Sequence, residues 1–159
     1  QPAMYELFDE PGTRLWDLAG AGSQVFPRGS YTRSIGLRYF DIIIIVTTCR
    51  FTQTEVVLLS ESDEHNVPRF VVRTMVDVDI SSNSADHGQS ATQTKMGILD
   101  DLCERGIQHP YLVNARCPEE HDFPRLAEDL DATIKSCQAG EVAQLSLAEQ
   151  FQVGDEVEV

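Results

Sequence analysis

Apolar runs alternate with polar stretches along the chain, and this pattern predicts strands separated by helices. The apolar runs, which predict strands, lie at residues 4–8, 13–17, 39–48, 69–76 and 111–114. The run 39–48 is rich in β-branched residues and has no polar alternation, so we expect a strand buried on both faces. Apolar residues recur at helical intervals over residues 53–64, over 91–105 and after Asp122, and we expect helices there. This order predicts an α/β fold in three layers, a mostly parallel sheet with helices on both faces.

Local signals mark the ends of the expected helices. Thr52 and Glu55 have the spacing of a capping box, which predicts a helix start. Gly106 follows the next helix at the position where a left-handed residue ends it, and the polar stretch 81–90 predicts a loop. In the first helix, the positions expected to face the sheet are Val56, Val57, Leu59 and Ser60. In the second helix, the expected apolar face consists of Met96, Leu99, Leu102 and Cys103.

The chain divides into one domain and a tail. With 159 residues and 42% hydrophobic residues, it is long enough for a single domain with a substantial core. We expect this domain to cover residues 1–137, whereas residues 138–159 form an acidic C-terminal tail in which only Val142–Phe151 has a helical pattern. The stretch 23–34 is expected to be irregular or weakly helical. Because the chain begins with Gln1 and not Met, we expect further residues to precede it.

Charge and cysteine content narrow the function classes. The chain has 26 acidic and 12 basic residues and a formal net charge of −14, which argues against nucleic-acid binding because phosphates require clustered cations. The longest apolar run, Ile42–Val46, is too short to span a bilayer. No two of the four cysteines have C-x-x-C spacing, and Cys49 and Cys103 are expected to be reduced core residues. We therefore expect a cytoplasmic protein.

The first candidate site lies where the strand 13–17 ends. Asp17 supplies a hard carboxylate oxygen suited to Mg²⁺, and Gly20 allows the backbone to approach a phosphate closely. The same D-x-x-G spacing also occurs at ordinary junctions between strands and turns. A dinucleotide-binding turn is a further alternative, since Gly20 and Gly22 follow a strand, but Val25 stands where that motif has its third glycine.

Two more candidate sites lie at the ends of later strands. Asp77, with Thr74 beside it, follows a buried strand, and its carboxylate matches the two N–H donors on the edge of guanine. Asn114, Ala115 and Arg116 follow the last strand, where a backbone N–H at Ala115 would donate to the guanine carbonyl. Carboxyl ends of parallel strands share one edge of a sheet, which is where such folds bind ligands.

These blocks together resemble the G domain of the immunity-related, interferon-inducible GTPases. That family has L-W-D-L-P-G-x-G-(S/T)-x-x-F, and this chain has L-W-D-L-A-G-A-G-S-Q-V-F from Leu15 to Phe26. The family pattern V-R-T-K-V-D-x-D-I corresponds to V-R-T-M-V-D-V-D-I from Val72 to Ile80. A strand like Y-D-F-F-I-I-I before R-F matches residues 39–51, and Y-D-F-P-x-L matches residues 121–126. The resemblance covers about residues 2–135.

The resemblance implies a role for each candidate residue in binding GTP or GDP with Mg²⁺. Asp17 would be the acid linked to Mg²⁺, and Gly20 the sensor of the γ-phosphate. Thr74 and Asp77 would read guanine, and the loop Asn114–Arg116 would close over the base. The family also implies innate immunity, self-association through the G domain and peripheral attachment to intracellular membranes.

Three departures from the family pattern bear on the candidate site. Met75 replaces the lysine that packs over the base, and Ala19 replaces a proline. The phosphate-binding motif G-x-x-x-x-G-K-S does not occur in the sequence. The resemblance therefore implies a Ras-like G domain that is incomplete at the N-terminus.

The missing phosphate loop has a structural consequence in this fold. The strand before that loop lies between the strands that contain Asp17 and Ile42–Val46, so its absence would leave two strand edges unpaired. We expect that the chain is incomplete or that the sheet closes over the gap. The complete domain would hydrolyse GTP, whereas this chain alone is expected to have no measurable activity. The alternative is a degenerate, non-catalytic G domain that serves as an interaction module.

Overall fold

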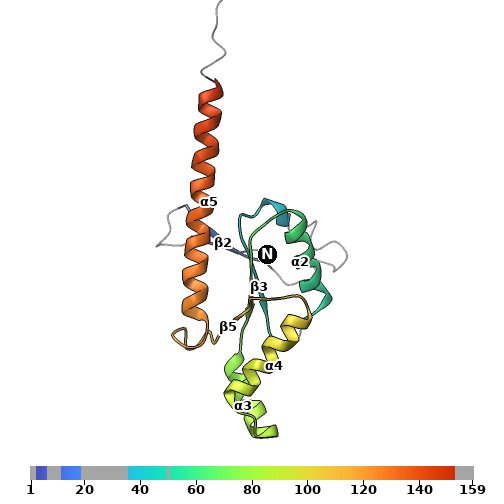
Figure 1. The fold of residues 1–159 in the computed structure, drawn as a ribbon. Coiled ribbons are helices and arrows are strands. Elements are labelled where there is room, and N and C mark those ends of the chain that lie inside the picture. The colour runs from blue at the N-terminus through green and yellow to red at the C-terminus, as the bar shows by residue number, and fades with distance from the viewer. Residues whose placement is uncertain (1–2, 7–11, 19–35, 50, 153–159) are drawn as a thin grey trace, which may run out of the picture.

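The computed structural model describes residues 3–6, 12–18, 36–49 and 51–152, and for residues 141–152 it describes the backbone alone. Figure 1 shows the elements in space. The strands are β1 (Ala3–Glu6), β2 (Arg14–Asp17), β3 (Ile43–Thr47), β4 (Arg69–Arg73) and β5 (Tyr111–Leu112). The helices are the short 3-10 helix η2 (Leu37–Tyr39), α2 (Gln53–Glu64), α3 (Val76–His87), α4 (Ala91–Glu104) and α5 (Phe123–Gln152). None of the described helices is both long enough and apolar enough to cross a bilayer.

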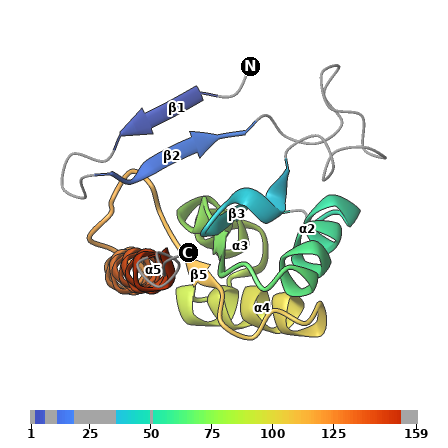
Figure 2. The ribbon, with the colours of Figure 1, turned by 90° about the horizontal axis from the view of Figure 1, so that it is seen from above.

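The described strands form two separate sheets. β1 and β2 pair as an antiparallel hairpin in which Ala3 lies opposite Asp17. β3, β4 and β5 form a parallel sheet with β4 in the centre, and Ile45 of β3 lies opposite Val71 of β4. Figure 2 shows the hairpin apart from this sheet, on the side of β3. Within the described residues, β2 and β3 therefore each have an edge without a partner strand.

Helices cover both faces of the parallel sheet. On one face, Phe70 and Val72 of β4 pack with Leu126 of α5. On the other face, Val71 packs with Leu102 of α4, and Leu59 of α2 contacts the same cluster. Because neighbouring residues of a strand point to opposite faces, β4 contributes to both cores. The expected arrangement of an α/β parallel sheet between helices is confirmed for this part of the chain.

The predicted helix ends agree with the structure. The backbone amide of Thr52 donates to the carboxylate of Glu55 across 2.7 Å, and the Thr52 hydroxyl accepts from the amide of Thr54, which completes the start of α2. Gly106 has a φ of 85°, and Ile107 N donates to Leu102 O across 3.0 Å at the end of α4. The short-range signals in the sequence are sufficient to fix these ends.

The prediction of a strand over 39–48 with two buried faces is wrong in part. Tyr39 lies in η2, and β3 begins only at Ile43. Val46 is 61% exposed, whereas its neighbours Ile45 and Thr47, which point to the other face of β3, are buried. β3 is thus an edge strand with the composition of a central one.

The expected faces of α2 and α4 are also wrong in part. Val56, Val57 and Ser60 of α2 are exposed, and Ser62 is the residue that α2 buries. In α4, Leu102 is buried as expected, whereas the other members of the predicted face, Met96, Leu99 and Cys103, are exposed. Cys49 is exposed too, so neither Cys49 nor Cys103 is a core residue. None of the four cysteines, all of which lie within the described residues, forms a disulfide.

The largest difference from the sequence prediction is α3. We expected a strand through Val76 and a loop at 81–90, but the strand ends at Arg73 and a helix runs over Val76–His87. Met75 adopts the left-handed conformation, with φ 62° and ψ 32°, and this turns the chain out of the sheet. Asp77 and Asp79 then lie in the first helical turn, where their negative charges favour a helix.

α5 continues without interruption across residue 138, where the expected tail begins. Its N-terminal part packs on the sheet through Leu126, and Ile134 further along the helix is also buried. Further along, Gln138 Nε2 donates to Thr13 Oγ1 across 3.2 Å, which joins α5 to the chain next to β2. In Figure 1 the helix then extends beyond the other elements. The stretch 23–34 lies outside the described residues.

Candidate functional site

The carboxyl ends of β4 and β5 meet at one edge of the parallel sheet. Val113 N donates to Arg73 O across 2.8 Å, which continues the pairing of the two strands by one residue. Val76 N then donates to Val113 O across 3.4 Å, beyond the end of β4. The structure thereby brings the segments Thr74–Asp77 and Asn114–Arg116 together, as the order of strands predicts.

Asp77 lies in the first turn of α3, directly after the left-handed Met75. The amide of Thr74 donates to Thr47 O of β3 across 3.0 Å, which attaches this turn to the sheet. The Asp77 side chain is half-buried, and its carboxylate has neither a hydrogen bond nor an ion pair within the described residues. Its oxygens are therefore available to accept from a ligand.

The loop after β5 is ordered by Asn114. This residue is buried, and its Oδ1 accepts from the amide of Arg116 across 3.0 Å. Cys117 N donates to Asn114 O across 3.2 Å, so the loop closes as a tight turn. The amide of Ala115 at the tip has no hydrogen-bond partner in the part of the chain that the structure describes. An exposed N–H thus lies at the tip of a fixed turn.

Cys117 shows that the two segments are electrostatically close. Burial raises the pKa of its thiol, and the negative charges of Glu120, Glu119 and Asp77 raise it further. Asp77 therefore acts on a residue of the loop after β5, which agrees with the hydrogen bond between Val76 and Val113.

Asp17 lies at the carboxyl end of β2 and is exposed. It belongs to the hairpin, whose strands pair with neither β4 nor β5 among the described residues. Gly20 lies outside the described residues. The structure therefore brings together two of the three predicted segments, Thr74–Asp77 and Asn114–Arg116.

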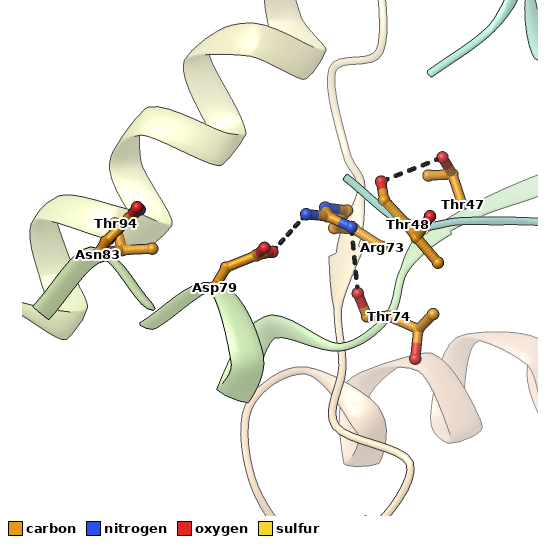
Figure 3. Close-up of polar contacts among 7 residues, drawn as sticks. All are labelled: Thr47, Thr48, Arg73, Thr74, Asp79, Asn83 and Thr94. Atoms are coloured by element: carbon orange, nitrogen blue, oxygen red, sulfur yellow. Dashed lines mark hydrogen bonds and ion pairs between the residues drawn. The ribbon is translucent and has the colours of Figure 1, made fainter. Parts of the chain in front are cut away.

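A buried ion pair, which the sequence analysis did not single out, adjoins the site (Figure 3). Arg73, the last residue of β4, has a side chain that is 6% exposed, and its Nη2 donates to Oδ2 of Asp79 in the first turn of α3. Its Nη1 donates to Thr74 O across 3.3 Å. A charged residue at the end of an apolar strand, followed six positions later by an acid, is the only signal of this pair in the sequence.

A cavity of about 240 Å³ lies on the α4 side of Arg73. Its wall is largely polar and includes Thr48, Asn83, Gln93, Thr94 and Asp101. The Asn83 amide donates to Thr94 Oγ1 across 3.4 Å and so joins α3 to α4. The hydrogen bond from Arg105 lowers the pKa of the Asp101 carboxyl, and the charge of Arg73 lowers it a little more.

The described residues offer few ligands for a metal ion. Asp17 supplies one exposed carboxylate, which suits a Mg²⁺ ion that keeps most of its waters and binds phosphate oxygens. A separate group at the end of α2 contains Glu61, Glu64 and His65, with ligand atoms within 4.8 Å of one another. This group shares no residue with the candidate site, and surface acids commonly cluster in this way without a metal ion.

Comparison with known proteins identifies relatives of the chain. The sequence model described as Interferon-inducible GTPase (IIGP) matches residues 1–151. The chain is 32% identical over 136 residues to the Immunity-related GTPase family M protein 2 of Mus musculus, a match that covers 84% of the chain and 34% of that relative. It is 31% identical over 134 residues to the Interferon-inducible GTPase 5 of Rattus norvegicus, covering 79% of the chain and 29% of the relative. It is 32% identical over 130 residues to the Interferon-inducible GTPase 1 of Mus musculus, covering 76% and 31%. The chain thus spans about a third of the length of these curated relatives.

Proposed function

Because the chain belongs to the interferon-inducible GTPase family, we propose that it supplies the guanine-reading part of a GTP-binding domain. The observation that carries this proposal is the meeting of Thr74–Asp77 with Asn114–Arg116 at the ends of two adjacent strands. One segment holds a carboxylate without a partner, and the other holds an exposed amide. Both features are what the edge of a guanine ring requires.

The chemistry of guanine matches these groups. The Asp77 carboxylate accepts from N1–H and from the 2-amino group, and the Ala115 amide donates to the ring carbonyl. Adenine has neither the N1–H nor the 2-amino donor, so the same site would leave the carboxylate unpaired and reject it. Thr74 and Arg116 flank these two contacts and complete the base site.

Asp17 and Gly20 belong to the phosphate end of the nucleotide in this proposal. Asp17 would hold Mg²⁺ through its exposed carboxylate, and the ion would neutralise phosphate charge in the bound nucleotide. Gly20 would donate its amide to the terminal phosphate. Both residues belong to the motif that matches the family from Leu15 to Phe26.

In this proposal, another segment supplies the phosphate-binding loop. Within the described residues, β2 and β3 each have an unpaired edge, and β3 is composed of apolar residues typical of a central strand. A strand that leads into a phosphate-binding loop would pair between them. The complete domain would hydrolyse GTP to GDP, and the 159-residue chain alone would have no measurable GTPase activity.

Met75 favours a second candidate function, an interaction module that no longer binds nucleotide. In the family pattern a lysine stands here, and the replacement removes a charge that would lie over the base. Met75 is 48% exposed and presents an apolar surface at the same place. Under this alternative, the surface of the G domain would remain a docking site for proteins, including further copies of the chain.

The proposal also covers the location of the protein in the cell and its self-association. None of the four cysteines forms a disulfide, and this supports the proposal of a reducing, cytoplasmic environment. Self-association through the G domain and peripheral attachment to intracellular membranes rest on the family alone.

Calorimetric titration of the full-length polypeptide that carries this chain, with GDP and with ADP, tests the proposed function. We expect binding of GDP, little binding of ADP, and loss of this preference in Asp77→Asn. Asp86→Asn, an exposed acid near the other end of α3, serves as the matched control and should bind as the unmodified protein does. Equal affinity for the two nucleotides would contradict guanine reading, and failure to bind either nucleotide would favour the interaction module. GTP turnover by the 159-residue chain, abolished in Asp17→Ala, would contradict the proposal that another segment supplies the phosphate-binding loop.

A further inference from the structure

Arg73 and Asp79 lie on either side of the turn that presents Asp77. Arg73 ends β4, Asp79 lies in the first turn of α3, and their side chains form an ion pair. We propose that Arg73 and Asp79 are positioning residues that hold the Asp77 carboxylate in the orientation required to read the 2-amino group of guanine. This inference rests on the proposed function and adds residues that do not contact the nucleotide.

The contacts of Arg73 span the turn from both sides (Figure 3). Its guanidinium donates to the carbonyl of Thr74, immediately before the left-handed Met75, and to the carboxylate of Asp79, after it. The amide of Asp79 in turn donates to Met75 O across 3.3 Å. The turn is therefore held at its beginning and at its end by one side chain.

The backbone of Arg73 is itself anchored. Its carbonyl accepts from Val113 N across 2.8 Å, and the next amide, that of Thr74, donates to β3 across 3.0 Å. The guanidinium therefore projects from a fixed point of the sheet. A planar guanidinium also donates in two fixed directions, so it constrains both of its acceptors together.

The ion pair between Arg73 and Asp79 is largely buried. The Arg73 side chain is 6% exposed and the Asp79 side chain 23% exposed, so neither charge is well solvated. An uncompensated charge in such a place is unfavourable, and the two groups must remain paired. Rotation of the first turn of α3, which would redirect Asp77, would separate them.

The chain offers a matched control at the other end of β4. Arg69, the first residue of β4, forms an ion pair with Asp63 of α2, again six residues apart. This second pair also joins β4 to a helix, but it lies away from Asp77 and from the loop Asn114–Arg116. The two pairs therefore share their sequence separation and the joining of β4 to a helix. They differ in place and in burial, because the Arg69 and Asp63 side chains are 31% and 64% exposed.

Asp79→Asn and Asp63→Asn are compared in the full-length polypeptide that carries this chain, with GDP, inosine diphosphate and ADP as ligands. Inosine diphosphate lacks only the 2-amino group, so the ratio of GDP affinity to inosine diphosphate affinity measures how well Asp77 is placed. Hydrogen exchange at the amides of Thr74 and Val76 measures the order of the turn in the same proteins. Asp79→Glu, which keeps the charge and lengthens the side chain, replaces Asp79→Asn if that variant does not fold.

In Asp79→Asn we expect the ratio of GDP affinity to inosine diphosphate affinity to fall by about tenfold, as for the loss of one hydrogen bond to a charged group. We also expect hydrogen exchange at the amide of Val76 to become faster. Asp63→Asn should leave the ratio and the exchange unchanged. A ratio in Asp79→Asn equal to that of the unmodified protein, which itself prefers GDP to ADP, would overturn the positioning role alone. If the unmodified protein shows no preference for GDP over ADP, the proposed function fails and the inference fails with it.

Discussion

The backbone amide of Val76 donates to the carbonyl of Val113 across 3.4 Å, and this contact joins the two segments of the proposed base site. Val76 is fully buried and is the first residue of α3, directly after the left-handed Met75 in the turn that follows β4. The contact therefore fixes Asp77 next to the loop Asn114–Arg116. The proposed base site therefore depends on the geometry of two strand ends.

Met75→Lys should tighten the binding of GDP by about two- to fivefold, as for one solvent-exposed ionic contact. The side chain at this position is 48% exposed, so a lysine is accommodated without loss of packing. Its aliphatic part would cover the base, and its ammonium group would add a positive charge beside the bound nucleotide. Calorimetric titration of the full-length polypeptide measures the change.

Met96→Lys is the control for that substitution, because Met96 is a second exposed methionine, at 58%, and lies on α4 away from the base site. Both variants reduce the net negative charge of the protein equally, which by itself favours binding of an anion. An equal gain in the two variants would show that Met75 has no specific place over the base.

Tyr111→Phe should change how stability depends on pH. Burial and the hydrogen bond to Asp129, at 2.7 Å, raise the pKa of Tyr111 to about 12. An unfolded tyrosine loses its proton near a pKa of about 10. Between these values the folded state keeps a proton that the unfolded state has lost, so stability is complete below about pH 10 and falls as the pH rises towards 12.

The expected loss from Tyr111 is roughly 2 kcal/mol at the upper end of that range, and Tyr111→Phe should lack this part of the pH dependence. Urea unfolding at several alkaline pH values measures the effect. Tyr39→Phe, at an exposed tyrosine, should keep the dependence of the unmodified protein. Identical pH profiles for Tyr111→Phe and the unmodified protein would contradict the raised pKa.

Asp122→Ala should destabilise the fold by roughly 1–3 kcal/mol, because it leaves a buried donor without its acceptor. The Asp122 carboxylate accepts from the amide of Leu112 across 2.9 Å and forms an ion pair with Arg125 at 3.2 Å. It therefore joins β5 to the start of α5. Glu128→Ala, at an exposed position of the same helix, should change the free energy of unfolding by less than about 0.5 kcal/mol in the same urea experiment. Equal effects would show that Asp122 has no structural role.

Short-range signals predicted the parts of the fold that depend on neighbouring residues. Thr52 and Glu55 form their capping box with no help from distant parts of the chain, and the parallel order of β3, β4 and β5 follows from the alternation of strands and helices. The association of Asp77 with Asn114 also follows from this order, because both residues come after neighbouring parallel strands.

Other features depend on contacts between distant parts of the chain, which the pattern of apolar and polar residues does not predict. α3 consists largely of serine, aspartate and asparagine, which favour turns and loops, so its sequence predicted a loop. The burial of Arg73 requires Asp79 on a helix that the sequence did not predict. Val46 is exposed although its residue type is typical of a core, and β3 is an edge strand among the described strands.

The most direct test of the central claim is a heteronuclear NMR titration of the 159-residue chain with GDP and, separately, with ADP. Contacts to the base alone support only weak, roughly millimolar affinity, which such titrations detect. We predict that GDP shifts the amide signals of Asp77 and Ala115 and that ADP at the same concentration does not. Equal shifts with both nucleotides, or GDP-specific shifts confined to residues away from the ends of β4 and β5, would contradict the account.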